Sequence, residues 1–339
     1  MTKKFGPVRK RTWTSAALLS LAAAMLLGLS SPATAEKIAV GNYGISANGM
    51  PYAVAMAKGY FKAEGADVDG IISSQGGGTS VRNLIAGGVA YGEANPGAIA
   101  VANAQGGDLV IIADTVHTVA EFVWAVKPDS PIKSIADLKG KKIGYTNPRS
   151  TSQALAILLL QKAGYKPEEA ELVKTGGFGE GVAALEAGLI DVAPMAEPVW
   201  SKFKGKFRAI VTATEALPPL GNVVGFTTKQ AAETRGDFIR AVIRARRKAV
   251  EFMEKNPDEA GDIIAKAYNL DVAVARSAVT SLTKSRTDGV AYWGTGQFQL
   301  AGMRRIVEVQ KMVGALPADV DPTKMIDTRF LPDDIKTPK

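Results

Sequence analysis

Polar hydrogen-bond donors are concentrated on one loop of this 339-residue chain. Residues 146–153 connect an expected strand at 142–145 to an apolar helix that begins near 151. The first N–H groups of a helix lack partners within it, and an arginine can pair with a carboxylate or sulfonate through two hydrogen bonds. The loop therefore predicts an anion site, unless one hydroxyl is only a helix cap and the arginine only a surface residue. Its candidate binding residues are Asn147, Arg149, Ser150, Thr151 and Ser152.

A second candidate is a glycine-rich stretch between an expected strand at 67–72 and an expected helix at 81–86. Glycine lets the backbone approach a ligand without a side chain in the way, and a helix N-terminus stabilises an anion. The alternative is an ordinary turn in which Thr79 or Ser80 caps the helix. The candidate binding residues here are Gln75, Gly77, Gly78, Thr79 and Ser80.

Two further candidates stand on loops near expected helices. Phe178 lies in a glycine-rich stretch at 176–181 and could cover a ligand. Glu197 precedes Pro198 and has two interpretations. It could hold the amine of a taurine-like zwitterion, or it could accept backbone donors and fix its loop. We favour the second, structural role.

The composition argues against catalysis. The chain has no cysteine and one histidine, which excludes disulfides, cysteine nucleophiles, thiolate metal sites and multi-histidine metal sites. A Ser-His-Asp triad would have to use His117, and the sequence has no glycine-flanked nucleophile elbow. We therefore expect no enzyme activity, no cofactor and no metal, and an ordinary hydrogen-bonded role for His117.

Residues 1–35 are typical of a cleavable export signal. Five lysine and arginine residues precede an apolar run at 16–27, and Ala33-Thr34-Ala35 supplies the small-x-small pattern of a signal-peptidase site. The run is too short to span a bilayer comfortably, although a membrane anchor is the alternative. Cleavage after Ala35 would lower the net charge from +8 to +3, which gives little reason to expect a nucleic-acid partner.

The lack of cysteine also bears on location. An exported binding protein of a bacterium with a single membrane is usually tethered through a lipidated cysteine at the cleavage site, and this chain cannot be tethered in that way. We therefore expect the periplasm of a bacterium with two membranes.

Beyond residue 35, short apolar runs alternate with helical patterns, which indicates parallel βαβ units. A helix, a glycine stop, a strand and a polar residue before proline occur at 84–96 and again at 185–198, which suits two lobes built on one plan. Extended, proline- or glycine-bearing stretches near 126–131 and 220–228 look like crossings between the lobes. We expect a signal peptide at 1–35, a discontinuous first lobe with C-terminal helices at 36–126 and 228–339, and a second lobe at 127–227.

An ordered set of motifs carries a resemblance to a known family. The motifs are Ala57-Lys58-Gly59-Tyr60-Phe61 with Glu64-Gly65, Ile85-Ala86-Gly87-Gly88, Ser134 to Gly144, Ala184 to Asp191, and Ala196-Glu197-Pro198. Together they resemble substrate-binding proteins of ABC importers, in the nitrate/sulfonate/taurine branch that also includes thiamine-precursor binders. The resemblance implies a type II periplasmic-binding fold, in which two α/β lobes close over a ligand cleft.

The resemblance also implies a site and partners. It places ligand contacts on loops after the first, third and later strands, and these carry Asn42, Tyr43, Ser46, Asn95 and Thr118. The predicted function is periplasmic capture of a small organic anion, sulfonate- or taurine-like or a carboxylate. The protein would act as a monomer and deliver its ligand to a permease with its ATPase. The alternatives are a pyrimidine or thiamine-precursor binder, an inorganic-anion binder for nitrate or bicarbonate, an enzyme on the same fold, or a sensor domain.

Overall fold

The computed structural model describes residues 1–4, 6, 35–74, 77–148, 150–316 and 320–339. Met1–Ala35 forms a unit separate from Glu36–Lys339. The apolar run at 16–27 of the predicted signal lies outside the described residues. In the part of the chain that the structure describes, no helix combines the length and apolarity needed to cross a membrane.

Six strands of Glu36–Lys339 form one mixed sheet in the order β13-β4-β10-β3-β1-β2. Parallel pairing joins β1 to β2 and to β3, whereas β10 runs antiparallel to both β3 and β4. Both β1 and β4 are mostly buried, as expected for strands covered on both faces. The strands of this first sheet are β1 (Glu36–Gly41), β2 (Val68–Ser74), β3 (Gly92–Ala94), β4 (Leu109–Val116), β10 (Val223–Thr228) and β13 (Trp293–Gly296).

Five further strands form the second sheet region. Three are antiparallel neighbours in the order β8-β5-β9, and two form the parallel pair β6-β7. A bridge between Ile143 and Val192 joins the pair to the chain just before β8. These strands are β5 (Phe122–Val126), β6 (Lys142–Tyr145), β7 (Glu171–Lys174), β8 (Ala193–Ala196) and β9 (Arg208–Thr212). A separate hairpin consists of β11 (Arg286–Thr287) and β12 (Val290–Ala291).

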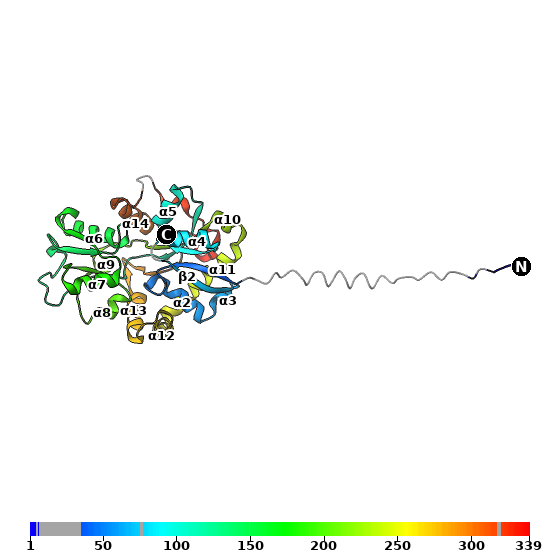
Figure 1. Ribbon diagram of the computed structural model, residues 1–339, viewed down its shortest axis with the longest axis horizontal. Helices are drawn as coiled ribbons and strands as arrows, with labels where there is room; N and C mark the ends of the chain where they lie inside the picture. Colours follow the sequence, from blue (N-terminus) through cyan, green and yellow to red (C-terminus); the bar gives the residue numbers. More distant parts are fainter. Residues whose placement is uncertain (5, 7–34, 75–76, 149, 317–319) are drawn as a thin grey trace. The chain divides into compact units, whose positions relative to one another are not determined.

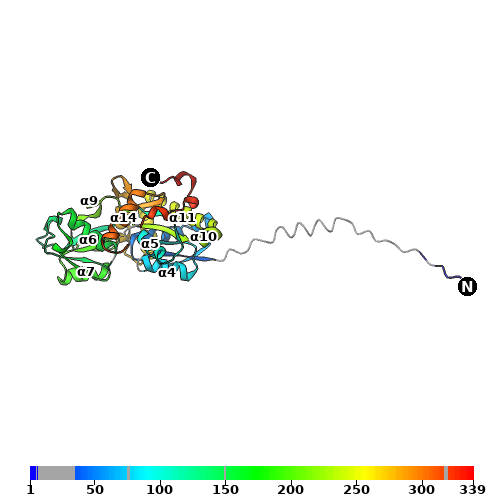
Figure 2. The same ribbon diagram turned by 90° about the horizontal axis from the view of Figure 1, so that it is seen from above.

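The helices gather around the two sheets. Figures 1 and 2 show α6, α7 and α9 at the end that holds the second sheet, and α4, α10 and α11 at the other end. Near the first sheet are α2 (Met50–Ala57), α3 (Tyr60–Glu64), α4 (Gly77–Gly87), α5 (Pro96–Ala104), α10 (Lys229–Thr234) and α11 (Gly236–Lys255). With the second are α6 (Thr151–Lys162), α7 (Phe178–Ala187), α8 (Val199–Phe203) and α9 (Ala213–Ala216). The later helices are α12 (Pro257–Tyr268), α13 (Val272–Lys284) and α14 (Leu300–Met312). Short 3-10 turns are η1 (Ala47–Gly49), η2 (Ile135–Asp137), η3 (Pro167–Glu169), η4 (Pro322–Met325), η5 (Thr328–Phe330) and η6 (Asp333–Ile335).

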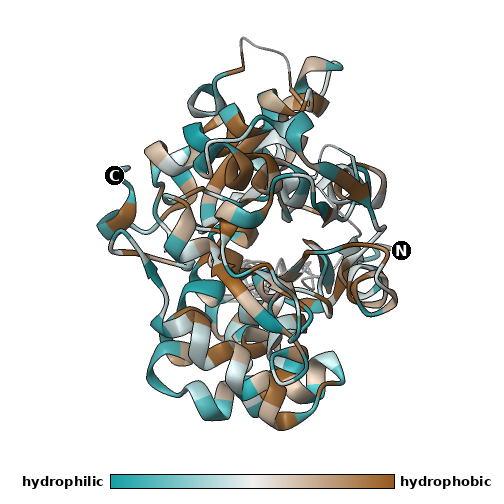
Figure 3. Cartoon of the chain, turned by 90° about the vertical axis from the view of Figure 1, so that its left-hand side faces the viewer, coloured by the Kyte–Doolittle hydropathy of each residue, from teal (hydrophilic) through white to brown (hydrophobic). Residues whose placement is uncertain are grey.

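The hydrophobic pattern explains how α11 packs. Apolar residues recur along it at helical spacing, and the positions at this spacing from Phe238 to Met253 are buried. Figure 3 shows the same arrangement more widely, with hydrophobic stretches in the interior and hydrophilic ones along outer helix faces. Helix α14 contacts both α5 and α6, so the C-terminal helices pack against parts of the chain that belong to both sheets.

The chain passes between the two sheets at residues 117–121 and 217–222. Phe122–Val126 pairs with β8 and β9, and Val223–Thr228 pairs with β3 and β4. The stretches expected to be crossings, 126–131 and 220–228, thus include residues of β5 and β10. An extended sequence pattern marks a strand but does not reveal which neighbour the strand will pair with. We propose that the lobes meet at 117–121 and 217–222.

Candidate functional site

One edge of the first sheet gathers polar loop residues. Val116 lies opposite both Val223 and Trp293, and Val224 lies opposite Ala94. Strands β1, β3 and β4 therefore end where β10 and β13 begin, and we call this the carboxyl edge of the first sheet. The residues directly beyond it are Asn42, Asn95, His117, Thr118, Asn222 and Tyr292.

The second sheet has a corresponding edge. Phe122 at the start of β5 lies opposite Ala196 at the end of β8, and Val123 lies opposite Thr212 at the end of β9. Strands β6 and β7 end together at Tyr145 and Lys174. The connections at 117–121 and 217–222 join the two edges directly. In open α/β sheets, ligands bind beyond the carboxyl ends of the strands, so the candidate site lies where these edges meet.

Asn222 links side chains from both edges. Its backbone oxygen accepts a hydrogen bond from Asn95 Nδ2 at 3.1 Å, and its side-chain Oδ1 accepts one from Thr151 Oγ1 at 3.4 Å. Its Nδ2 donates to Glu121 Oε1 at 2.8 Å. Two predicted site residues, Asn95 beside the first sheet and Thr151 beside the second, thus share Asn222, which was not among the predicted site residues.

The loop at 146–153 before α6, which we call the hydroxyl loop, uses its polar side chains in several different hydrogen bonds. Ser150 caps the helix by accepting from the backbone N–H of Gln153 at 3.2 Å. Ser152 is buried, and its Oγ accepts from the backbone N–H of Thr146 at 2.9 Å. Asn147 donates to the carbonyl of Gly176 at 2.8 Å, which ties this loop to the one before α7. The predicted contact Arg149 lies outside the described residues.

The described part of the glycine stretch, Gly77 to Ser80, is helical rather than a loop. Helix α4 already begins at Gly77, so the helix predicted at 81–86 starts earlier than expected, with Gly78 and Thr79 in its first turn. A side chain at Gly77 would meet the Cβ of Ala98 at 2.7 Å, so this glycine lets α4 and α5 pack closely. Ser80 is fully buried, and its Oγ has no hydrogen-bond partner among the described residues. Gln75 is not among the residues described.

The loop after β1 is held by its neighbours. Asn42 adopts a left-handed conformation with φ of 53°, which asparagine tolerates better than most residues. Tyr43 accepts from Ser73 Oγ through its backbone oxygen, and its ring packs edge-on against Tyr268 at 5.3 Å between ring centres. The Ser46 hydroxyl donates to Asn48, which in turn donates to the carbonyl of Gly41. These contacts hold the predicted residues Asn42, Tyr43 and Ser46 near the end of β1.

Of three other predicted residues, Thr118 lies beyond the edge of the first sheet, and Phe178 and Glu197 lie at or next to the edge of the second. Thr118 is buried, and its hydroxyl accepts from the backbone N–H of Ala120 at 3.3 Å. Phe178 begins α7 and packs edge-on against Phe122 at 5.7 Å. Glu197 accepts from the backbone N–H and the hydroxyl of Ser201 at 3.1 and 3.0 Å, so both carboxylate oxygens serve to fix its own loop.

Glu121 is the most unusual group at the junction. It is 5% exposed, and burial raises its pKa to about 8 against the opposing effect of its hydrogen-bonding neighbours, so the carboxyl is mostly neutral at pH 7. Its Oε2 and the hydroxyl of Tyr292 are buried, and neither has a hydrogen-bond partner of standard geometry in the described part of the chain. Burial also raises the pKa of Tyr292 well above its usual value, so its hydroxyl stays protonated.

His117, the only histidine of the sequence, contacts a backbone carbonyl in the described part of the chain. His117 lies 3.0 Å from the carbonyl oxygen of Gln297, to which its Nε2 can donate. Burial lowers the pKa of His117 to about 4, so the ring is neutral at pH 7. Among the residues described, no three His, Asp or Glu side chains are grouped closely enough to hold a metal ion.

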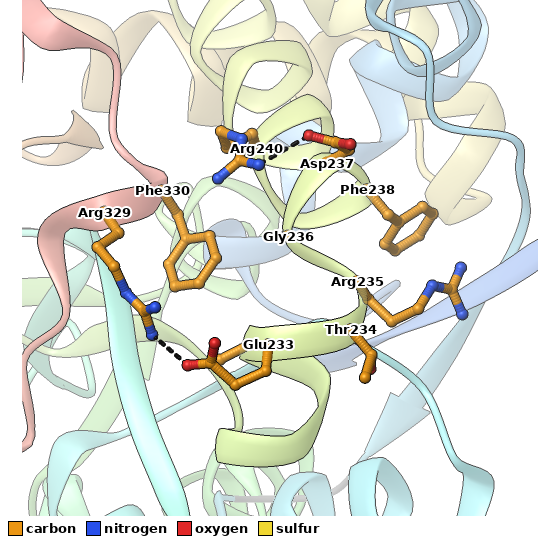
Figure 4. A pocket seen from close by; sticks show the side chains of 10 residues that line it. Glu233, Thr234, Arg235, Gly236, Asp237, Phe238, Arg240, Arg329 and Phe330 are labelled. Carbon is orange, nitrogen blue, oxygen red and sulfur yellow. Dashed lines mark hydrogen bonds and ion pairs between the residues drawn. The ribbon is translucent and has the colours of Figure 1, made fainter.

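A surface groove lies at the opposite edge of the first sheet. It is lined by α10, the start of α11, Arg329 and Phe330, as Figure 4 shows. Thr228, which precedes α10, pairs with Leu109 at the start of β4, so the groove is at the far end of the strands from Asn222. Arg329 pairs with Glu233 at 2.8 Å and Arg240 with Asp237 at 2.7 Å. These arginines already have acidic partners, and the groove is not the candidate solute site.

Solved structures of binding proteins share this architecture. The periplasmic aliphatic sulphonate binding protein SsuA from Escherichia coli has a TM-score of 0.72 at 20% identity, covering 88% of this chain and 93% of that protein. The periplasmic nitrate-binding protein NrtA from Synechocystis PCC 6803 has a TM-score of 0.67 at 14% identity, covering 88% and 87%. These matches confirm the predicted α/β periplasmic-binding fold.

Sequence similarity points the same way. RibY, a riboflavin-binding protein of Chloroflexus aurantiacus, is 26% identical over 297 residues, which cover 83% of this chain and 82% of that protein. Residues 46–260, more than half of the chain, match the family model described as NMT1/THI5 like. The chain therefore belongs to the NMT1/THI5-like family.

Proposed function

We propose that this protein is the periplasmic solute-binding component of an ABC importer and that it captures a small organic anion. The observation that carries the proposal is the meeting of the two carboxyl edges, where Asn222 joins Asn95 of one edge to Thr151 of the other. A solute bound there would touch both sheets and hold them together. Such a solute-dependent closure is the signal that a membrane permease can read.

Helix N-termini support an anionic solute. Helices α5 and α6 begin directly after the loops that carry Asn95 and Ser150, and α7 begins at Phe178. Each presents backbone N–H groups and a partial positive charge toward the edges. Glu121 is mostly neutral at pH 7, and Glu197 is used within its loop, so neither places an exposed negative charge there. The sulphonate- and nitrate-binding names of two structural relatives agree with this solute class.

Capture without chemistry is the mode of action that we propose. The sequence holds no cysteine, and the neutral ring of His117 faces a backbone carbonyl rather than a nucleophile. The relatives compared above are named as binding proteins. Export by the segment at 1–35, a periplasmic location, a monomeric state and delivery to a permease driven by an ATPase complete the proposal.

A pyrimidine-type heterocycle is the second candidate. The neighbouring carboxyl and amide of Glu121 and Asn222 together offer donors and acceptors of the kind that a heterocyclic amide edge can pair with. The similarity to a protein named for riboflavin binding supports the same solute class.

Solute-dependent stabilisation tests the proposal. Protein expressed from the full-length sequence should melt at a higher temperature in the presence of an alkanesulfonate, an aromatic carboxylate or nitrate, and should not convert any of them. Because only the folded state binds, a hundredfold excess over the dissociation constant should stabilise it by about 2.7 kcal/mol. Mass spectrometry of solute retained through native purification identifies the natural ligand. Turnover of a bound compound, or no stabilisation by any anion, would contradict the proposal.

A further inference from the structure

Glu121 stands at the centre of the junction between the sheets. It is the last residue of the connection 117–121, and the next residue begins β5. Its backbone oxygen accepts from the N–H of Glu197 at 3.0 Å, and its side chain reaches Asn222 in the other connection. Both passages of the chain between the sheets are thus joined through this one residue.

The hydrogen bonds around Glu121 assign a different role to each oxygen. Thr151 donates to Asn222 Oδ1, which leaves the NH2 group of the amide facing Glu121. This amide donates to Oε1, so Oε1 is the acceptor and the proton of the neutral acid belongs on Oε2. Oε2 is buried and has no partner of standard geometry among the residues that the structure describes, although the neighbouring hydroxyl of Tyr292 contacts this carboxyl and opposes the rise of its pKa. A buried donor whose contact falls short of standard geometry is poorly satisfied, so a better acceptor on a solute would lower its free energy.

The groups that the structure places against Glu121 carry no positive charge that would favour loss of this proton. Asn222 is a neutral amide, Tyr292 is protonated, and the carboxyl of Glu197 is turned to Ser201. The buried cation in this half of the molecule is Arg246, whose Nη1 and Nη2 donate to the carbonyls of Gly294 and Thr115.

We infer that the carboxyl of Glu121, oriented by Asn222, donates a hydrogen bond from Oε2 to the head group of the bound anion. The inference rests on the proposed function. The hydroxyl of Tyr292, which contacts the same carboxyl without standard hydrogen-bond geometry, supplies a second donor to the head group. Glu121 thereby determines specificity, because an ionised carboxyl there repels an anion and the neutral acid attracts it.

The consequence is an affinity that depends on pH. An anion should bind with constant affinity up to the pKa of Glu121, near 8, and should lose about tenfold in affinity for each pH unit above it. A heterocycle that donates N–H to this carboxyl would show the opposite trend. Glutamine keeps a donor at the Oε2 position and an acceptor toward Asn222, and it cannot ionise.

The experiment compares the full chain with its Glu121→Gln and Glu121→Ala variants by calorimetric titration at pH 6.5, 7.5, 8.5 and 9.5. The probes are ethanesulfonate, benzoate and nitrate. For the wild type, the dissociation constant of the best probe should rise at least tenfold between pH 7.5 and 9.5. Glu121→Gln should stay within about threefold of the wild-type value at pH 7.5 and remain flat with pH, whereas Glu121→Ala should lose at least tenfold. Glu186→Gln, which removes an exposed carboxyl paired with Lys206, is the matched control and should follow the wild type.

The possible results distinguish the role of Glu121 from the capture of an anion. If the probes bind with an affinity that does not change with pH, or that rises with pH, the role of Glu121 is overturned while solute capture stands. If no probe binds at any pH, the anion assignment fails and the inference fails with it. Equal affinities of the wild type and Glu121→Ala would also overturn the inference, provided that both variants melt cooperatively.

Discussion

Replacing Arg246 by methionine is expected to destabilise the folded protein by about 3–5 kcal/mol, because it leaves a buried carboxylate and two backbone carbonyls without their partner. Arg246 lies on α11 and is 2% exposed. Its Nε stands 3.2 Å from Glu93 Oε1, and its Nη1 and Nη2 donate to Gly294 and Thr115 at 2.6 and 2.7 Å. The side chain thus ties the ends of three strands, β3, β4 and β13, to one helix.

This arrangement supports the carboxyl edge of the first sheet. Glu93 also accepts from Tyr52 at 2.6 Å, and the Tyr52 and Tyr91 hydroxyls are 2.7 Å apart, so the loss of Arg246 disturbs a connected buried network. Urea denaturation at pH 7 measures the change in the free energy of unfolding.

The matched control for Arg246→Met is Arg240→Met on the same helix. Arg240 is partly exposed and pairs with Asp237 one turn away, so its loss should change stability by less than about 1 kcal/mol. The double variant Glu93→Gln with Arg246→Met should be less destabilised than the sum of the two single variants, because it leaves no unpaired buried charge. Equal stabilities of Arg246→Met and Arg240→Met would show that the buried network does not hold the edge.

The second large effect is a pH-dependent loss of stability caused by Glu121. In the unfolded chain this carboxyl loses its proton near its usual pKa of 4.5, whereas in the folded protein it keeps the proton until about pH 8. Between these values the folded state binds one more proton than the unfolded state, so stability falls as pH rises. The contribution is fully present below pH 4.5, declines through the window and is constant above pH 8. Its total is on the order of 5 kcal/mol.

The comparison with Glu121→Gln isolates this effect from other titrating groups. Denaturation in the absence of added solute at pH 5, 6.5, 8 and 9.5 gives the stability difference between the wild type and the variant at each pH. The difference should shift against the wild type from pH 5 to pH 8 and then level off. A difference that is the same at all four values would mean that Glu121 titrates normally in the folded state.

Much of the fold could be predicted because its signals are local. The apolar run of β4, the capped apolar helix α6 and the helical spacing along α11 each depend on neighbouring residues in the sequence. Strand partners are not local. Phe122–Val126 is apolar in either sheet, and only its pairing with β8 and β9 shows that the chain has already crossed.

The candidate site also has residues that the sequence reveals and residues that only the fold brings together. The hydroxyl loop stands out in the sequence because Ser150, Thr151 and Ser152 are consecutive, although the structure gives two of them capping and loop-fixing bonds. Glu121 and Asn222 are 101 residues apart in sequence, and each by itself is an ordinary polar residue beside an apolar strand. Their importance comes from burial and from their contact, and the only sequence signal was that Asn222 falls in an expected crossing.

A crystal structure of the protein with its retained solute, or with the best of the three probes, would show whether one solute is held by both sheets. We expect the solute to contact the edge that carries Asn95 and Thr118 and, at the same time, the loop that carries Ser150 and Thr151, with Glu121 beneath it. A solute held by one sheet alone, or lodged in the groove beside Arg240 and Arg329, would contradict the account.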